Sequence, residues 1–200
     1  MRVTLLGASP LGPHATRRLL ALAPSPNTLP GHPLAATWAP CTVEHLHYHG
    51  WPDHGAPRDT DGIRSLCAAL DAHRHLQRPF VVHCSAGIGR TGTFCAVDVL
   101  LRRMWALGPP PMQRAPAAGG EQQEGEEDAA AAAAGVGPPA LSPLLFDVPS
   151  LVAELRAQRS GMVQTFEQYA YVGTAALEEA AALAAGARPP AFGRGQPAMK

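Results

Sequence analysis

Residues 80–92 read FVVHCSAGIGRTG, and this stretch decides how the rest of the chain is interpreted. Its first three residues form a short aromatic and β-branched run, which predicts a buried strand. A glycine-bearing loop follows, and residues 93–105 then carry apolar side chains at helical spacing. The pattern therefore predicts a strand, a tight loop and a helix, with loop N–H groups and the helix N-terminus facing one anion-binding concavity.

Two side chains at this concavity are candidates for a chemical role. Cys84 ends the strand, and Arg90 lies six residues later at the opposite lip. A helix N-terminus and nearby cations lower the pKa of a thiol, and the resulting thiolate is a nucleophile. The planar guanidinium of Arg90 matches two phosphate oxygens, and the hydroxyl of Thr91 can donate to the sulfur. This combination indicates nucleophilic attack on a phosphorus atom.

A second stretch supplies a candidate acid. Residues 51–57 read WPDHGAP, in which the prolines and the glycine predict a loop and Trp51 provides a large anchor. Cleavage of a phosphate ester requires a proton on the departing oxygen. Asp53 is therefore a candidate general acid on a mobile loop.

Three stretches together resemble the protein tyrosine phosphatase family. Residues 80–92 resemble its signature loop, residues 51–57 its Trp-Pro-Asp loop, and residues 155–169 its glutamine loop. The resemblance covers residues 42–105 and 147–175. It implies an α/β fold in which a twisted mixed sheet, flanked by helices, carries the strand–loop–helix core. It also implies a phosphocysteine mechanism that uses no metal or other cofactor.

The resemblance assigns roles to particular residues. Cys84 would be the nucleophile, and Asp53 would protonate the leaving oxygen and then act as a base. Gln164, supported by Gln168, would position the water that hydrolyses the phosphocysteine. His83 would orient the loop and help to set the pKa of the thiol. The expected catalytic residues are Cys84, Arg90, Asp53, Gln164, Thr91 and His83; the expected substrate-binding residues are Ser85, Ala86, Gly87, Ile88, Gly89, Arg90, Asp53, Gln164 and Gln168.

The resemblance covers only the C-terminal half of a phosphatase domain. The tyrosine-bearing loop of Lys-Asn-Arg-Tyr type, which holds the phosphotyrosine ring in this family, has no counterpart here. Only residues 1–40 are available for the preceding strands. We therefore expect residues 1–200 to form one partial domain that is truncated at its N-terminus, with apolar faces left uncovered.

Two alternatives stay open beside a protein tyrosine phosphatase. The first is a phosphate-binding protein with little turnover, which the absent ring-binding loop favours and the complete set of catalytic residue types opposes. The second is a dual-specificity or lipid phosphatase. An inositol head group would favour basic residues between Cys84 and Arg90, and no lysine lies there.

The charge balance and the cysteine content indicate which partners and which cellular compartment to expect. The 16 basic and 16 acidic residues give a formal net charge of zero, which favours neither nucleic acid nor an anionic membrane. No pair of the four cysteines has zinc-finger spacing, and a reactive Cys84 must stay reduced. We expect a cytoplasmic or nuclear protein without a signal peptide or membrane span, acting on phosphotyrosine-containing proteins. Its oligomeric state is not indicated.

The remaining sequence divides into periodic and biased segments. Alternation or helical spacing predicts strands at 1–6, 16–22 and 42–49 and helices at 59–76, 147–159 and 165–185. Residues 24–40 are predicted to form a loop, residues 106–143 a low-complexity disordered insertion, and residues 187–200 a flexible tail.

Three histidines at period two raise the question of a metal site. His45, His47 and His49 share one side of the predicted strand. Zinc is often held by three histidines, but residues spread along an extended strand do not converge on one ion without a bend. The pattern favours solvated or packed histidines, and no metal is expected.

Overall fold

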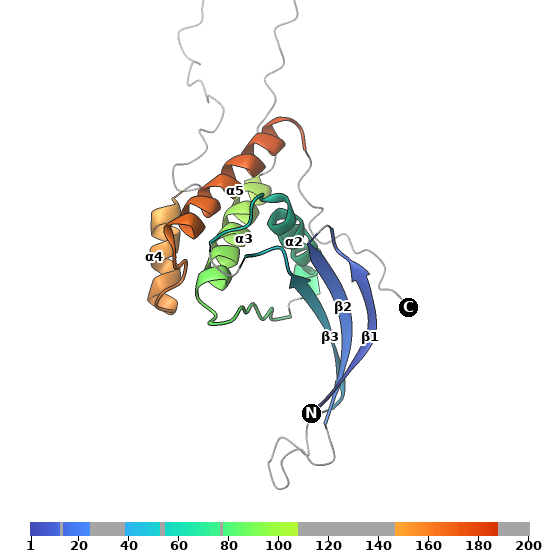
Figure 1. Ribbon diagram of the computed structural model, residues 1–200. Helices are drawn as coiled ribbons and strands as arrows, with labels where there is room; N and C mark the ends of the chain where they lie inside the picture. The colour runs from blue at the N-terminus through green and yellow to red at the C-terminus, as the bar shows by residue number, and fades with distance from the viewer. Residues whose placement is uncertain (13, 25–38, 53–54, 77, 108–146, 188–200) are drawn as a thin grey trace, which may run out of the picture.

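The computed structural model describes residues 1–12, 14–24, 39–52, 55–76, 78–107 and 147–187. Figure 1 shows the helices gathered in one body and a curved sheet that extends from it. The elements in chain order are β1 (Arg2–Pro10), β2 (Ala15–Ala23), β3 (Cys41–Tyr48), α2 (Asp61–Asp71), the 3-10 helix η1 (Arg74–Leu76), α3 (Gly89–Leu107), α4 (Val148–Gln158) and α5 (Phe166–Ala184). The predicted α/β class is confirmed.

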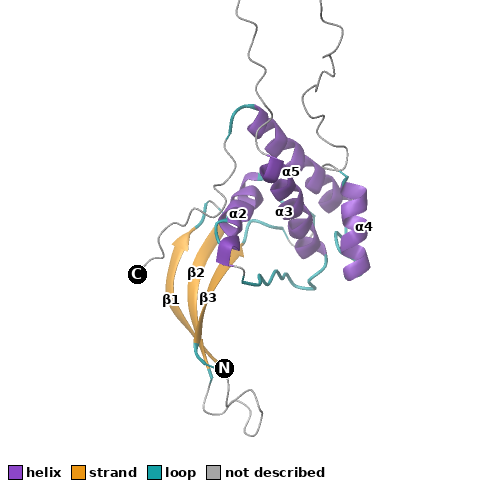
Figure 2. Ribbon diagram, turned by 180° about the vertical axis from the view of Figure 1, so that it is seen from behind, coloured by secondary structure: helices purple, strands orange, loops and turns teal. Residues whose placement is uncertain are grey.

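The sheet is antiparallel, in the order β1-β2-β3. Leu20 of β2 lies opposite Leu5 on one side and Val43 on the other, and the register of β1 shifts between Leu5 and Gly7. Only β3 lies next to the helical body (Figure 2). Leu46 and Tyr48 of that strand pack against the core, so β3 joins the sheet to the helices.

The structure of residues 80–82 differs from the buried strand that the sequence predicts. These residues have no regular secondary structure and belong to no strand, so the described sheet is antiparallel rather than mixed. Val82 packs against the core, whereas Val81 is 87% exposed and Phe80 is 39% exposed. A strand requires a hydrogen-bonded neighbour, and no described segment takes that position beside residues 80–82. The predicted buried strand is wrong for this reason.

The hydrophobic core lies among the helices, with α3 at its centre. Val97, Leu100 and Leu101 of α3 are fully buried, because α2, α4 and α5 pack around this helix. Apolar side chains at helical spacing therefore cover more than one face of α3, which is what a central helix requires. The helix that follows the Cys84 loop therefore lies at the centre of the core.

A buried carboxylate joins three of these helices. Glu179 of α5 accepts a hydrogen bond from the indole N–H of Trp105 in α3, at 2.6 Å. Its second oxygen accepts from Arg64 of α2, at 2.8 Å from Nε. Glu179 is 7% exposed, and these contacts satisfy both of its oxygens.

Local capping sets where the last two helices begin. Asp147 accepts a hydrogen bond from the backbone N–H of Ser150, and a proline lies in the first turn, as the sequence predicted for α4. Thr165 and Gln168 form a reciprocal capping box at the start of α5. At α2, by contrast, the Thr60 hydroxyl does not cap the helix and instead donates to Glu178.

Several predictions lie largely outside the described residues. They are the loop at 24–40, the insertion at 106–143 and the tail at 187–200, although α3 continues through Leu107. Among the helices that the structure describes, none has both the length and the apolar composition needed to cross a membrane.

Candidate active site

The Cys84 loop is a turn between a segment without regular secondary structure and a helix. Residues 85–88 bend, and α3 begins at Gly89, with the first helical hydrogen bond running from the Gly92 N–H to the Ile88 carbonyl at 2.8 Å. Gly87 has a φ of 70°, which favours glycine. Its N–H donates to the sulfur of Cys84 at 3.2 Å. The glycine thus allows the loop to fold back over the thiol.

The electrostatic surroundings of Cys84 favour a thiolate. Partial burial is the largest single effect and raises the pKa of the thiol. Interactions with the Thr91 hydroxyl and with the backbone N–H groups of Thr91, Gly87 and Ile88 outweigh burial and bring the pKa from 9.0 to about 7. A substantial fraction of Cys84 is therefore ionised at neutral pH, as a nucleophile requires.

The Thr91 hydroxyl is buried beside the Cys84 sulfur. It makes no hydrogen bond of regular geometry within the described part of the chain, although it is close enough to the Cys84 sulfur to lower its pKa. We treat it as a weak donor to the sulfur for that reason. A buried hydroxyl without a regular partner is costly, so this position is suited to a negative charge on sulfur or on a ligand.

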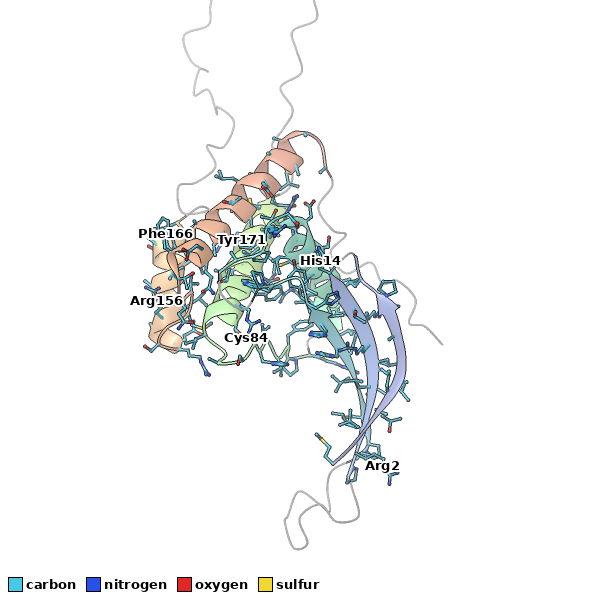
Figure 3. All side chains as sticks on the ribbon, in the orientation of Figure 1. Arg2, His14, Cys84, Arg156, Phe166 and Tyr171 are labelled. Atoms are coloured by element: carbon cyan, nitrogen blue, oxygen red, sulfur yellow. The ribbon has the colours of Figure 1, made fainter. Side chains whose placement is uncertain are left out.

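Arg90 lies in the first turn of α3 and lines the same cavity as Cys84. Its guanidinium makes no hydrogen bond or ion pair with any residue that the structure describes, so its donors are available to an anion. Ser85 and Ala86 are exposed on the loop between these two residues. Figure 3 shows the Cys84 side chain between α3 and the sheet rather than on the α4 side.

A strained turn presents Gln164 to this loop. Val163 has a φ of 58°, an unusual value for a β-branched residue, and its side chain is fully buried. Arg156 of α4 holds the turn by donating to the carbonyls of Met162 at 2.9 Å and Val163 at 2.7 Å. The Val163 N–H also donates to the Ile88 carbonyl at 3.4 Å, which ties the turn to the Cys84 loop.

Both glutamines lie against the start of α3. A side chain on Gly89 would stand 3.1 Å from Gln164 Oε1 and 3.1 Å from each terminal atom of Gln168. The Gln168 Oε1 accepts from the N–H groups of Gln164 at 2.8 Å and Thr165 at 3.3 Å. Gln168 therefore caps α5 and fixes the backbone of Gln164 with the same oxygen.

The loop that begins at Trp51 also contacts Gln168. The indole N–H of Trp51 donates to the Gly55 carbonyl at 3.0 Å, which closes the loop across its mouth. The amide of Gln168 donates to the same carbonyl at 3.4 Å. Asp53 itself lies outside the described residues, so its role as the acid stays a prediction.

His83 is exposed, and its ring Nδ1 donates to the Cys84 carbonyl at 3.4 Å, a long hydrogen bond. The three alternating histidines lie on β3 and beyond its end, with the rings of His45 and His47 stacked at 5.6 Å. Within the described residues, no group of three or more His, Cys, Asp or Glu is arranged to hold a metal ion.

Two arginines of the predicted glutamine-loop stretch shape the site in a way that the sequence did not predict. Besides Arg156, which supports the Val163 turn, Arg159 donates to the Ala86 carbonyl at 3.2 Å and lies against Gly87. Both residues fall near the end of α4, where cations are common for helix-dipole reasons alone. The spacing of Arg159 carried no signal of its contact with the Cys84 loop, 73 residues earlier in the chain.

Comparisons with known proteins agree on one family. The family model for protein-tyrosine phosphatase matches residues 33–115 and 140–178. Protein-tyrosine-phosphatase PTP1 of Arabidopsis thaliana is 35% identical over 147 residues, which are 74% of this chain and 33% of that protein. Human tyrosine-protein phosphatase non-receptor type 20 is 34% identical over 68% of this chain and 24% of its own length.

Human receptor-type tyrosine-protein phosphatase alpha is 34% identical over 64% of this chain, which spans only 12% of that longer protein. The chain thus spans a third or less of the length of each of these relatives. The family model nevertheless covers more than half of this chain, including the Cys84 loop, the Trp51 loop and the Gln164 turn. The chain belongs to the protein-tyrosine phosphatase family.

Proposed function

We propose that this chain hydrolyses phosphotyrosine in proteins through a phosphocysteine intermediate. The observation that carries the proposal is the loop folded around the Cys84 sulfur, with the Gly87 N–H donating to it at 3.2 Å; donors of this loop lower the pKa of the thiol to about 7. Each named relative is a tyrosine phosphatase, which supports the same substrate class.

In the first step the Cys84 thiolate attacks phosphorus in line with the tyrosyl oxygen. The sulfur–phosphorus bond forms as the phosphorus–oxygen bond breaks, and Asp53 gives its proton to the departing tyrosyl oxygen. Arg90 and the N–H groups of residues 85–90 bind the three equatorial oxygens, where negative charge is held during transfer.

In the second step water displaces the sulfur. Gln164 orients the water, and Asp53, now ionised, accepts the proton that the water loses. The water oxygen bonds to phosphorus, and Cys84 leaves as a thiolate assisted by the Thr91 hydroxyl. Inorganic phosphate is released and the starting enzyme returns. No metal takes part in these steps. Because Cys84 must stay reduced to act as a nucleophile, a cytoplasmic or nuclear location suits this mechanism.

A second candidate function is binding of phosphotyrosine without turnover. One observation favours it: residues 80–82, which lead into the Cys84 loop, have no strand beside them in the described part of the chain. A loop that lacks this support can bind an anion and still misplace the nucleophile, and small displacements cost much of the rate.

The two functions are separated by hydrolysis of a small aryl phosphate in the presence of a chelator. We expect turnover that Cys84→Ser abolishes and that the matched Cys41→Ser, at an exposed cysteine, retains. Rapid quenching with labelled substrate should show phosphate on the protein, with more of it in Gln164→Ala. A folded chain that binds a phosphotyrosine peptide without releasing phosphate would overturn the hydrolytic proposal.

A further inference from the structure

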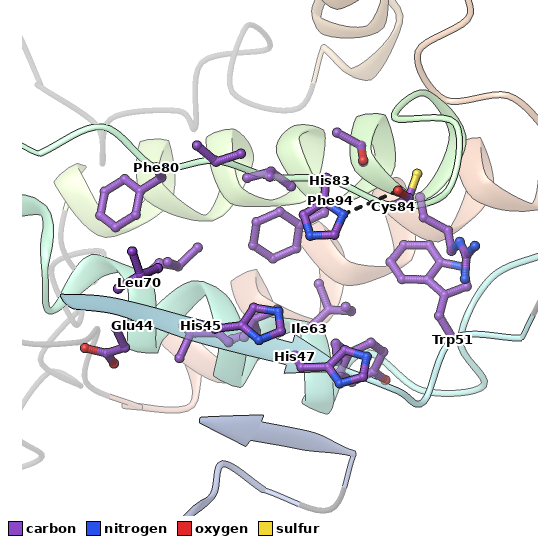
Figure 4. Close-up of a pocket in the computed structure, with 18 of the residues that line it drawn as sticks. Glu44, His45, His47, Trp51, Ile63, Leu70, Phe80, His83, Cys84 and Phe94 are labelled. Carbon is purple, nitrogen blue, oxygen red and sulfur yellow. Dashed lines mark hydrogen bonds between the residues drawn. The ribbon is translucent and has the colours of Figure 1, made fainter. Parts of the chain in front are cut away.

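Residues 79–84 lead into the Cys84 loop without a sheet to hold them. They border a mainly apolar cavity of about 670 Å³ that separates them from β3, and Val81 is 87% exposed. Figure 4 shows Phe80 at one end of this cavity and Cys84 at the other. Among the residues that the structure describes, no backbone hydrogen bond joins residues 79–84 to another segment. Side-chain contacts therefore fix where these residues lie.

Phe80 makes such a contact near the start of the segment. The guanidinium of Arg74, in η1, lies over the Phe80 ring, with Cζ 5.2 Å from the ring centroid. The face of an aromatic ring is electrostatically negative, so a cation in this position is attracted to it. Val82 packs against the core nearer to Cys84. Arg74 thus restrains the part of the segment that lies before Val82.

Two carboxylates hold Arg74 itself in place. Its Nη2 donates to both carboxylate oxygens of Asp98 in α3, at 2.7 and 2.5 Å. Its Nε lies 3.5 Å from Oδ1 of Asp71, the last residue of α2. The Asp71 side chain is fully buried, and its oxygens make no regular hydrogen bond within the described residues. A buried carboxylate requires a nearby cation, so Arg74 is bound to both helices.

These interactions connect α3 with the segment that carries Cys84. Asp98 lies two helical turns after Thr91, whose N–H and hydroxyl interact with the Cys84 sulfur. Asp98, Arg74 and Phe80 thus join the helix on one side of the sulfur to the chain that leads to it on the other. Loss of the Arg74–Phe80 contact would leave that chain free to shift toward the cavity.

We propose that Arg74 is a positioning residue for the nucleophile, which acts through Phe80 to hold Cys84 against the start of α3. This proposal rests on the proposed function of Cys84. It adds a residue that lies outside the Cys84 loop, the Trp51 loop and the Gln164 turn. Without the contact, the sulfur would lie farther from the N–H groups that stabilise the thiolate, and its pKa would rise.

The test measures the rate at which iodoacetamide alkylates Cys84 as a function of pH. The thiolate is the reacting species, so the midpoint of this profile reports the pKa of the thiol. The measurement uses a Cys41→Ser background, because Cys41 is exposed. Cys67 is buried, and burial raises the pKa of Cys95, so both react more slowly than Cys84.

Phe80→Leu removes the ring but keeps an apolar side chain, and it leaves Arg74 and both carboxylates unchanged. We expect its midpoint to lie above that of the unmodified chain, with alkylation about two- to fivefold slower at about pH 6. Phe80→Tyr keeps the ring and should restore the midpoint of the unmodified chain. An unchanged midpoint in Phe80→Leu, or an equal shift in Phe80→Tyr, would overturn the proposal.

Arg74→Lys keeps a positive charge beside Asp71 and Asp98 but lacks the planar guanidinium. It should shift the midpoint in the same direction as Phe80→Leu. The double variant should react no more slowly than the slower single variant, because both substitutions remove the same contact. If the two effects multiply instead, Arg74 does not act through Phe80 and the proposal is wrong.

The matched control is Arg102→Met. Arg102 Nε lies 3.9 Å from the same oxygen of Asp71, but the described structure has no stacking between Arg102 and Phe80. Its removal should lower stability toward urea without moving the midpoint. A midpoint shift in Arg102→Met equal to that in Arg74→Lys would indicate a general structural effect and would overturn the proposal.

Failure of the catalytic proposal is distinguishable, because alkylation requires no turnover. If no aryl phosphate is hydrolysed while Phe80→Leu still raises the midpoint, the proposed hydrolysis fails and the positioning of Cys84 by Arg74 stands. Hydrolysis of the aryl phosphate together with an unshifted midpoint in Phe80→Leu would reject the role of Arg74 alone.

Discussion

A methyl group placed on Gly92 of α3 would stand 2.5 Å from the backbone nitrogen of Val163. The two segments are therefore in backbone contact at this point, 71 residues apart in sequence. Gly92 follows the Cys84 loop by one helical turn, and Val163 immediately precedes Gln164. This contact brings the nucleophile and the candidate water-positioning residue into one site.

Gly92→Ala should therefore destabilise the chain and separate the two segments. No flexible side chain can yield, because the atoms met are backbone atoms of Met162 and Val163. We expect a loss of about 1–3 kcal/mol in the free energy of unfolding, measured by urea denaturation. Turnover of an aryl phosphate should fall as well, because Gln164 moves with the turn.

The control for that substitution is Gly173→Ala in the middle of α5, where an added Cβ meets nothing within 4 Å. There alanine should be neutral or stabilise by up to about 1 kcal/mol, through helix propensity. If Gly92→Ala were as stable as Gly173→Ala, the close approach of the two segments would be wrong.

Arg156→Met should slow the second chemical step more than the first. The substitution keeps the length of the side chain but removes the two hydrogen bonds that hold the Val163 turn. Gln164 would lose its fixed position while Cys84 keeps its surroundings. We expect an exponential burst of released phenol in rapid mixing, with a steady-state rate reduced by about tenfold or more.

Arg2→Met, at an exposed position on the far end of the sheet in Figure 3, is the matched control and should behave like the unmodified chain. Equal reductions of the burst and of the steady-state rate in Arg156→Met would contradict a specific effect on Gln164. They would indicate a general loss of structure instead.

Thr91→Ala should raise the pKa of Cys84. The thiolate is the species that reacts with iodoacetamide, so the alkylation rate rises with pH through the pKa, which is about 7 in the unmodified chain. Removal of the Thr91 hydroxyl takes away a donor to the sulfur, so the midpoint should move upward, toward the ordinary 9.0. At neutral pH the variant should be alkylated more slowly.

Thr91→Ser keeps the hydroxyl and should keep the midpoint near that of the unmodified chain. Both variants are best made in a Cys41→Ser background, because Cys41 is exposed and would react as well. An unchanged midpoint in Thr91→Ala would mean that the backbone N–H groups alone set the pKa of Cys84.

Glu179→Gln should destabilise the helical body. The change removes the carboxylate of Glu179, which is only 7% exposed, and leaves Arg64 paired with the exposed Asp61 at 3.3 Å. We expect a loss of about 1–3 kcal/mol in the free energy of unfolding, because a charge-assisted hydrogen bond in a buried site is weakened and Asp61 compensates for it only in part. Glu154→Gln, at an exposed position of α4, should change stability by less than about 0.5 kcal/mol. Similar losses in the two variants would argue against the link between α2, α3 and α5.

The helices and the chemistry of the Cys84 loop could be predicted from sequence because both depend on neighbours along the chain. Apolar spacing placed α3 and α5, and the Asp147 cap and nearby proline placed the start of α4. The same pattern failed at residues 80–82. An apolar run indicates a strand only when a partner supplies the other half of its hydrogen bonds, and that partner is not encoded locally.

The sequence by itself determined which residue types the site contains: a thiol within a glycine-bearing loop, an arginine six residues later, and glutamines that follow α4. Only the tertiary structure decided how they meet. The contact of Gly92 with Val163 and the hydrogen bond from Arg159 to the Ala86 carbonyl join segments distant in the chain. Such contacts depend on how helices and strands pack in three dimensions, whereas spacing and composition report only on neighbours along the chain.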